Sequence, residues 1–187
     1  MSLIPAFEIG VWNAWILTAY QLIAIPFLFR IASKRGTTHD NKLELSNNQR
    51  VITGSTKLLI FPLLIYTIFL PLKLGTIWFY IGLPITLLGL VTGAIVLVNW
   101  ATAPPNAPVT GGLYRYSRHP MYITDVLFFL GLGIATASWI FLLFSVLWIV
   151  TGFTLAKPEE RDCLEKYGDA YRKYMNRTPR WIGIPKS

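Results

Sequence analysis

A cluster of cationic and aromatic side chains, Y-R-Y-S-R-H-P-M-Y, occupies residues 114–122 directly before a long apolar run. Arg118 can pair with a carboxylate or a phosphate, and Pro120 can begin a helix whose first backbone N–H groups remain free to bind an anion. The faces of the tyrosine rings attract cations. The cluster is therefore either an ordinary anchor at a membrane interface or the polar wall of a site that works at the membrane surface.

Two adjacent acidic residues, Glu159 and Glu160, follow the last long apolar run. Placed opposite Arg118, they would suit an amine, ribose hydroxyls or a sulfonium group. A ligand that combines a carboxylate, an amine, a ribose and a positively charged sulfur is S-adenosylmethionine. The competing interpretation is that the two acids only cap a helix that begins at Pro158, where the helix dipole favours negative charge.

Asp125 lies inside an apolar segment, one helical turn after Tyr122. An ionisable side chain within a membrane span is costly and by default a candidate functional residue. Its depth of about 7 Å, from the helical rise after Pro120, also permits a position in contact with water. The two histidines and one cysteine of the chain have no metal-ligand spacing, so we expect no metal site.

The composition predicts an integral membrane protein. Hydrophobic residues make up 53% of the 187 and charged residues 14%, which is too apolar for a soluble domain of this size. A helix needs roughly 17–25 residues to cross about 30 Å of hydrocarbon. The sequence therefore predicts an all-α protein with five transmembrane helices, at residues 11–29, 58–74, 77–98, 121–137 and 139–156.

The net charge of +8 fits membrane orientation better than nucleic-acid binding. With five spans, 16 of the 17 Lys and Arg side chains fall on one side, and the positive-inside rule places that side in the cytosol. We therefore expect the N-terminus outside, the C-terminus in the cytosol, and membrane lipids rather than nucleic acid as partners. The first residues, M-S-L-I-P-A-F-E, lack the basic region of a signal peptide, so we expect no cleavage.

The spacing of the apolar segments predicts which polar clusters meet. Only A-T-A-S, residues 135–138, separates the last two predicted spans, so they should form a tight helical hairpin. The hairpin would return the segment after the fifth span to the R-H-P turn. The glycines of G-L-V-T-G, residues 89–93, predict close approach of another helix to the third span. An aromatic face at helical spacing predicts a cytosolic C-terminal helix over the pocket, formed by Leu164, Tyr167, Tyr171 and Tyr174.

The second half of the chain resembles a known superfamily. G-L-Y-R-Y-S-R-H-P-M-Y (112–122), then the hairpin, then E-E-R-D-C-L-E-K-Y-G-D-A-Y-R-K-Y (159–174) are similar to isoprenylcysteine carboxyl methyltransferases and phospholipid N-methyltransferases, which are membrane-embedded enzymes. The resemblance covers residues 99–187, the expected catalytic half of a single domain, whereas residues 1–98 match only in being hydrophobic. It implies transfer of a methyl group from S-adenosylmethionine, held under the tail, to a lipophilic acceptor that enters from the bilayer.

The resemblance and the chemistry together nominate site residues. An amine acceptor must lose its proton before it attacks, so His119 and Glu160 are candidate catalytic proton acceptors, whereas a carboxylate acceptor needs no base. Tyr122 and Asp125 are candidate substrate residues. The cofactor contacts that the resemblance implies are Asn106, Ala107, Pro108, Val109, Tyr114, Arg118, His119, Pro120, Met121 and Glu159.

Two positions depart from the pattern of the carboxyl methyltransferases. Asn106 stands where those enzymes often carry histidine, and Leu155 stands where they carry an arginine assigned to the substrate. Without that arginine, a lipid amine is at least as suitable an acceptor as an isoprenoid or prenylcysteine-like carboxylate.

Two other classes of protein stay open at this point. Membrane sterol and steroid reductases also pair a histidine-proline turn with a polar tail and bind NADPH, but they are generally longer, and no glycine-rich phosphate loop is present here. A non-enzymatic membrane scaffold would use the same turn and basic tail to bind anionic lipids.

Overall fold

The computed structural model describes residues 8–34 and 44–186, so the first seven residues and residues 35–43 of the first basic loop lie outside the described residues. The described chain consists of α1 (Trp15–Lys34), α2 (Asn47–Tyr66), α3 (Ile77–Ala101), the 3-10 helix η1 (Gly112–Arg115), α4 (Pro120–Ala135), α5 (Trp139–Tyr167) and α6 (Asp169–Arg177). Within these ranges there is no β-strand, only one isolated bridge between Asn13 and Pro71. The all-α prediction is confirmed.

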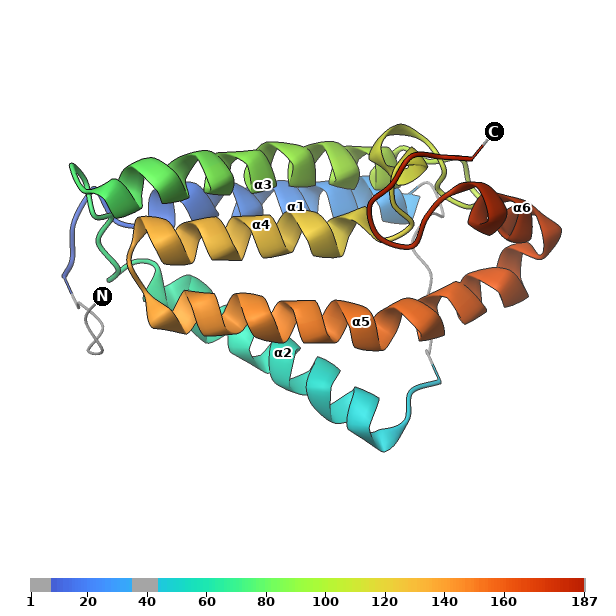
Figure 1. The fold of residues 1–187 in the computed structure, drawn as a ribbon, viewed down its shortest axis with the longest axis horizontal. Helices are drawn as coiled ribbons and strands as arrows, with labels where there is room; N and C mark the ends of the chain where they lie inside the picture. The colour runs from blue at the N-terminus through green and yellow to red at the C-terminus, as the bar shows by residue number, and fades with distance from the viewer. Residues whose placement is uncertain (1–7, 35–43, 187) are drawn as a thin grey trace.

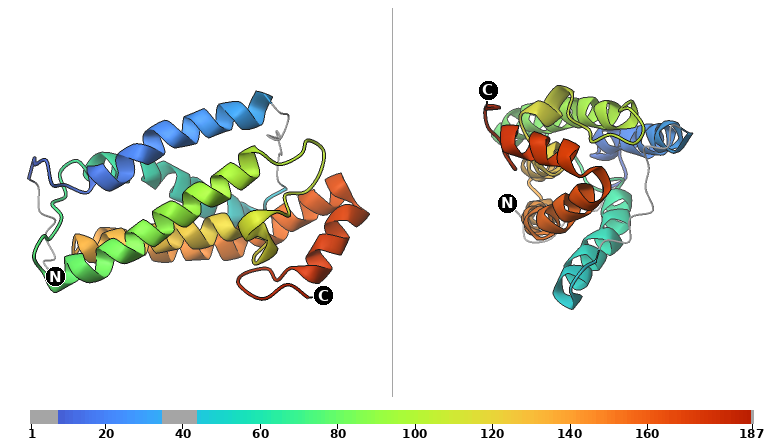
Figure 2. Two further views of the ribbon diagram at one scale, coloured as in Figure 1. Left: turned by 90° about the horizontal axis from the view of Figure 1, so that it is seen from above. Right: turned by 90° about the vertical axis from the view of Figure 1, so that its right-hand side faces the viewer.

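The helices form an elongated bundle in which α4 lies between α3 and α5 (Figure 1). α1 lies beside α3, and α2 crosses α5 obliquely (Figure 2). Thr56 of α2 and Thr151 of α5 share a hydrogen bond of 2.7 Å at this crossing. At one end of the bundle, α6 and the C-terminal segment fold back over the start of α4.

Glycines let α3 and α4 approach closely. A methyl group added at Gly82 or Gly89 would overlap the α4 backbone at Ala135 or Phe128. On the α4 side, Gly131 is equally close to the α3 backbone. The predicted close approach of a helix to the third span is confirmed for Gly89, and its partner is α4.

Two helices are long and apolar enough to cross a membrane, α3 and α5, and α4 is a shorter apolar helix. Large hydrophobic side chains remain exposed on α3 and α5, including Leu88, Val91, Leu143 and Phe153. Such apolar outer surfaces suit lipid rather than water. Most charges of α5 fall in its last turns, residues 157–167, which project beyond its apolar part. The five-span topology itself stays a prediction.

α2 begins well before the predicted second span at residues 58–74. Ser46 caps the helix, since its Oγ accepts a hydrogen bond from the Gln49 backbone and the Gln49 side chain accepts one from the Ser46 backbone. This reciprocal capping box fixes a start in polar sequence that a search for apolar runs does not detect.

Two segments outside the helices pack against each other and shift the expected helix ends. Residues 8–14 lie against residues 67–72, and the Ala14 backbone N–H donates to the Leu70 carbonyl at 2.8 Å. α1 therefore begins after the predicted Val11, and α2 ends before the predicted end of the second span.

No separate tail helix begins at Pro158, as the sequence suggested, because α5 continues from its apolar part to Tyr167. A proline has no N–H to donate to the carbonyl four residues earlier, which here belongs to Thr154. The side-chain amide of Gln49, on α2, donates to that carbonyl at 3.4 Å. This contact replaces the missing helical hydrogen bond, and the charged end of α5 continues its apolar part as one helix.

The turn between α4 and α5 brings the polar clusters together. Residues 136–138 join the two helices, with the Ser138 N–H donating to the Gly133 carbonyl at 2.8 Å and Ala137 at a positive φ of 51°. Below the polar end, aromatic residues fill the space between α4 and α5, chiefly Phe128, Phe129, Phe141 and Phe144. α4 therefore starts, and the charged end of α5 lies, at the same end of the bundle.

Candidate active site

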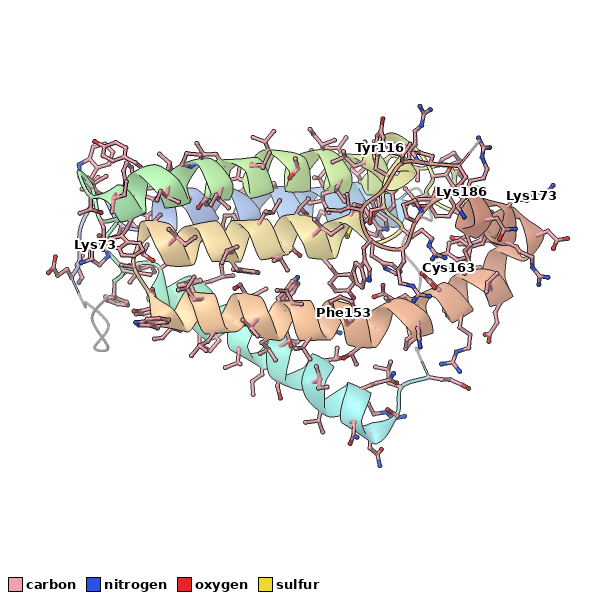
Figure 3. The ribbon with its side chains drawn as sticks, in the orientation of Figure 1. Lys73, Tyr116, Phe153, Cys163, Lys173 and Lys186 are labelled. Carbon is pink, nitrogen blue, oxygen red and sulfur yellow. The ribbon has the colours of Figure 1, made fainter. Side chains whose placement is uncertain are left out.

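A pocket of about 470 Å³ opens at this end of the bundle. Its walls are the loop at residues 103–109, the start of α4, the second half of α5 and the tyrosines of α6. Figure 3 shows Cys163, one of the lining residues, on α5 at the end where α6 folds back, with Lys73 at the opposite end of the bundle. The volume is within the range of about 300–1,000 Å³ that small-molecule sites occupy.

The R-H-P turn at the start of α4 is held by hydrogen bonds on both sides. The Ser117 Oγ accepts a bond from the His119 backbone at 3.0 Å and donates one to the Arg180 carbonyl at 3.2 Å. The Arg118 backbone donates to the Pro179 carbonyl at 3.1 Å. Pro120 then occupies the first turn of α4, so the turn is fixed before α4 begins.

His119 lies between the two acidic residues of α5. Its Nδ1 is 3.2 Å from Glu159 and its Nε2 is 3.3 Å from Glu160, and the residue is buried. Burial lowers the pKa of His119, but hydrogen bonds to Glu159 and Glu160 and their charges outweigh burial and raise it overall. The two carboxylates thus stabilise the protonated ring relative to that of an isolated histidine.

Glu160 is buried and paired with cations. It accepts bonds from Arg180 Nε at 2.9 Å and from an Arg180 terminal nitrogen at 2.6 Å, and Arg118 lies 3.3 Å from the same carboxylate. Burial raises the pKa of Glu160, but the bonds from His119 and Arg180 and the charges of both arginines lower it to about 2. A carboxylate held in this way is a poor proton acceptor, and its contacts instead order the residues around it.

Glu159 faces the pocket, and its side chain is 32% exposed. The Tyr122 hydroxyl donates to Glu159 Oε1 at 2.6 Å, while His119 approaches the other oxygen. The carboxylate is thus oriented by two neighbours and still open to a ligand.

Arg118 contributes an unused donor. Its Nε is buried and has no hydrogen-bond partner among the described residues, and the side chain lines the pocket. A buried donor without a partner is costly, so an anionic group of a ligand would be stabilised there.

Tyrosines form the opposite wall. Tyr171 and Tyr174 of α6 are buried, and the Tyr174 hydroxyl donates to the Tyr114 carbonyl at 2.7 Å. Gly168, at a positive φ of 52°, ends α5 and turns the chain into α6. The aromatic face expected on a single tail helix is thus divided between two helices, and both parts line the pocket.

The sequence model of the phospholipid methyltransferase family matches residues 76–170. The chain belongs to the phospholipid methyltransferase family. The match runs from the start of α3 into α6, so it contains the loop, the R-H-P turn and the charged end of α5. The predicted membrane methyltransferase superfamily is confirmed.

One curated relative is named as a methyltransferase. Over 81 residues the chain is 35% identical to methanethiol S-methyltransferase 1 of Bradyrhizobium diazoefficiens. The aligned segment covers 43% of this chain and 27% of that relative. The chain therefore spans well under two thirds of the relative's length. Together with family membership, this similarity supports a methyltransferase.

Twelve of the thirteen nominated residues line the pocket. Glu160 does not, because it lies behind the wall in its ion pairs. Their individual roles stay predictions. The residues that the structure brings to the pocket as nominated are Asn106, Ala107, Pro108, Val109, Tyr114, Arg118, His119, Pro120, Met121, Tyr122, Glu159 and, deeper in α4, Asp125.

Sequence reasoning missed part of the wall. Continuing at helical spacing from Glu159 gives Asp162, Cys163 and Lys166, which line the pocket, so periodicity could have found them. Trp100 and Trp148 also line it, but in apolar helices they resemble ordinary core or interface aromatics. The role of Arg180 depends on a fold-back of the C-terminal segment that no local pattern indicates.

Proposed function

We propose that this protein transfers the methyl group of S-adenosylmethionine to a lipophilic acceptor at the cytosolic face of a membrane. The observation that carries the proposal is that Arg118 and Glu159 face one pocket with opposite charges. The shared pocket lies at the polar end of apolar helices, where a ligand from water and an acceptor from lipid can meet.

The residues present fit S-adenosylmethionine. The unpartnered Nε of Arg118 would bind its carboxylate, and Glu159 would accept hydrogen bonds from its amine or ribose. The tyrosine rings of the α6 wall suit a positively charged sulfur. The loop at residues 106–109 would lie along the rest of the molecule.

When bound there, S-adenosylmethionine supplies a methyl carbon that a nucleophile can attack in line with the carbon–sulfur bond. The contribution of the protein is to align the reactants and to exclude water. Tyr171 and Tyr174 of α6 line the pocket, and we infer that α6 shields it from water. Glu160 positions Arg118 and His119 through its ion pairs.

The acceptor is proposed only by class. The family description favours a lipid amine, and the superfamily resemblance adds an isoprenoid or prenylcysteine-like carboxylate. The name of the curated relative adds a thiol. All three are nucleophiles to which a methyl group can be transferred.

The orientation in the membrane is part of the proposal. Figure 3 shows Lys173 and Lys186 at the pocket end of the bundle and Lys73 at the other end. The positive-inside rule then places the pocket and the C-terminus in the cytosol, with five spans in all and the N-terminus outside.

The experiment incubates purified protein with methyl-labelled S-adenosylmethionine and lipid extract, and measures release of S-adenosylhomocysteine and label in the organic phase. We expect release that depends on the lipid and falls at least about tenfold in Glu159→Gln, the scale of one lost charge-assisted contact. Glu165→Gln, an exposed substitution on the same helix, is the matched control. No release by a folded protein, or equal loss in both variants, would contradict the proposal.

A further inference from the structure

The deep end of the pocket differs from the rest of its wall. Tyr122 and Asp125 of α4 face Trp148 of α5 there, and the rings of Tyr122 and Trp148 have centroids 6.5 Å apart. Trp148 lies 18 residues before Lys166 on α5, which is about 27 Å by helical rise. The site is therefore elongated along α5, and Tyr122, which donates a hydrogen bond to Glu159 at 2.6 Å, joins the deep end to the charged cofactor-facing wall.

Asp125 has no cationic partner at this end. None of the ion pairs among the described residues includes it, and the nearest cations, Arg118 and His119, are paired with Glu160 and Glu159. The Trp148 indole nitrogen is buried without a hydrogen bond of good geometry, although it lies close enough to act on the Asp125 carboxylate. The Asp125 carboxylate therefore lines the pocket beside the Trp148 indole and without an ion-pair partner among the described residues.

The space beyond Trp148 is filled. Phe129 and Phe144 are buried, and their ring centroids lie 5.6 Å and 5.8 Å from that of Trp148. Tyr122 packs against α5 at Gly152, where an added methyl group would come within 3.1 Å of its ring. The pocket therefore closes beyond Trp148 on a packed aromatic cluster, which limits the size of a group bound at this end.

We propose that the deep end binds a compact acceptor with a transferable proton, a thiol or an amine, and that Asp125 takes this proton. The acceptor's lone pair forms the bond to the methyl carbon as the carbon–sulfur bond breaks, the bonding pair stays on the sulfur, and the acceptor's proton passes to a carboxylate oxygen of Asp125. Atoms and charge balance without a further reactant. This inference rests on the proposed methyl transfer and narrows its acceptor.

The same geometry excludes a carboxylate acceptor. A second anion beside Asp125 would meet like charge in an apolar surrounding with no free cation described nearby, and such repulsion is strong where water is scarce. A carboxylate also carries no proton at neutral pH, so it would leave Asp125 without a role.

A binding experiment tests the charge preference without turnover. Protein saturated with S-adenosylhomocysteine is titrated calorimetrically with butylammonium and with butyrate, which share size and differ in charge. We expect butylammonium to bind at least about tenfold more tightly, and Asp125→Asn to remove the preference. Tighter binding of butyrate, as a protonated Asp125 would give, overturns the inference.

An activity experiment tests the proton transfer. Methyl transfer is measured with butanethiol, butylamine and butyrate, for the wild type, Asp125→Asn and Asp169→Asn. Asp169 is the matched control because its side chain is 92% exposed on α6. We expect transfer to the thiol or the amine but not to butyrate, and a loss of at least about 100-fold in Asp125→Asn alone, the usual contribution of a general base.

The outcomes separate this inference from the proposed function. If S-adenosylhomocysteine binds to Asp125→Asn within about threefold of wild type, the fold and cofactor site are intact, and the rate loss belongs to Asp125. Methylation of butyrate, of none of the three compounds, or at an unchanged rate in Asp125→Asn overturns this inference alone. Failure of the wild type to bind S-adenosylhomocysteine overturns the proposed function as well.

Discussion

At the scale of single residues, the buried carboxylate of Glu160 forms ion pairs with Arg118, His119 and Arg180. Its position behind the wall makes it an organiser of the turn and the C-terminal segment. The proposed reactive end of the pocket lies elsewhere, at Tyr122 and Asp125.

Truncation of Arg180 tests the organising role. Arg180→Ala leaves the Glu160 carboxylate without its two closest bonds, while Arg180→Lys keeps a charge but loses the two-pronged contact. Because the Arg180 side chain is 35% exposed, we expect a loss of about 2 kcal/mol, below the range for fully buried pairs. In detergent, we expect the melting temperature to be highest for the wild type, lower for Arg180→Lys and lowest for Arg180→Ala. An Arg180→Ala protein as stable as the wild type would contradict the organising role of Glu160.

The pH dependence of stability follows from Glu160. Folding lowers its pKa from the ordinary 4.5 to about 2, so the ionised carboxylate stabilises the fold above pH 4.5 and this contribution is lost as the pH falls toward 2. We expect the melting temperature of wild type to fall steeply in this window and that of Glu160→Gln to fall less. Parallel curves for the two proteins would show that the carboxylate contributes nothing there.

Part of the site was predictable at the residue scale, and the reason is chemical. The R-H-P turn and Glu159 are unusual beside apolar runs, so their types alone indicated a site. Arg180 and Trp181 were not predictable, because they act after a fold-back, in which Trp181 packs between His119 and Phe153 at 5.8 Å and 4.7 Å. Trp148 was hidden because tryptophan is common in apolar helices.

At the scale of elements, the contact between α3 and α4 positions the R-H-P turn. Gly89→Ala would place a methyl group against the α4 backbone at Phe128, and overpacking of this kind costs about 1–3 kcal/mol. Gly54→Ala is the control, since nothing lies within 4 Å of its added methyl group in α2 and alanine favours a helix. We expect a lower melting temperature for the first variant only, and equal effects would contradict the close packing.

Local sequence patterns predicted some helix ends and missed others. Apolar runs located α3, α4 and the first part of α5, because those helices contact lipid or core along their length. They did not locate the start of α2, which depends on the Ser46 cap, or the passage of α5 through Pro158, which depends on Gln49 from another helix. Long-range hydrogen bonds of this kind leave no local pattern.

At the scale of the whole molecule, the proposed orientation can be measured with single cysteines. In a Cys163→Ser background, Lys73→Cys and Lys173→Cys place thiols at opposite ends of the bundle (Figure 3). With sealed vesicles of known sidedness and an impermeant maleimide, we expect the Lys173→Cys protein to be labelled only from the cytosolic side and the Lys73→Cys protein only from the other side. Labelling of both from one side would contradict the topology.

Calorimetric titration with S-adenosylhomocysteine tests most directly whether the pocket under α6 binds S-adenosylmethionine. We expect micromolar binding by the wild type, binding weakened at least about tenfold in Glu159→Gln, and unchanged binding in Glu165→Gln. NADPH, the cofactor of the reductase alternative, should not bind. Absence of S-adenosylhomocysteine binding by the folded wild type, or tight binding of NADPH, would contradict the account.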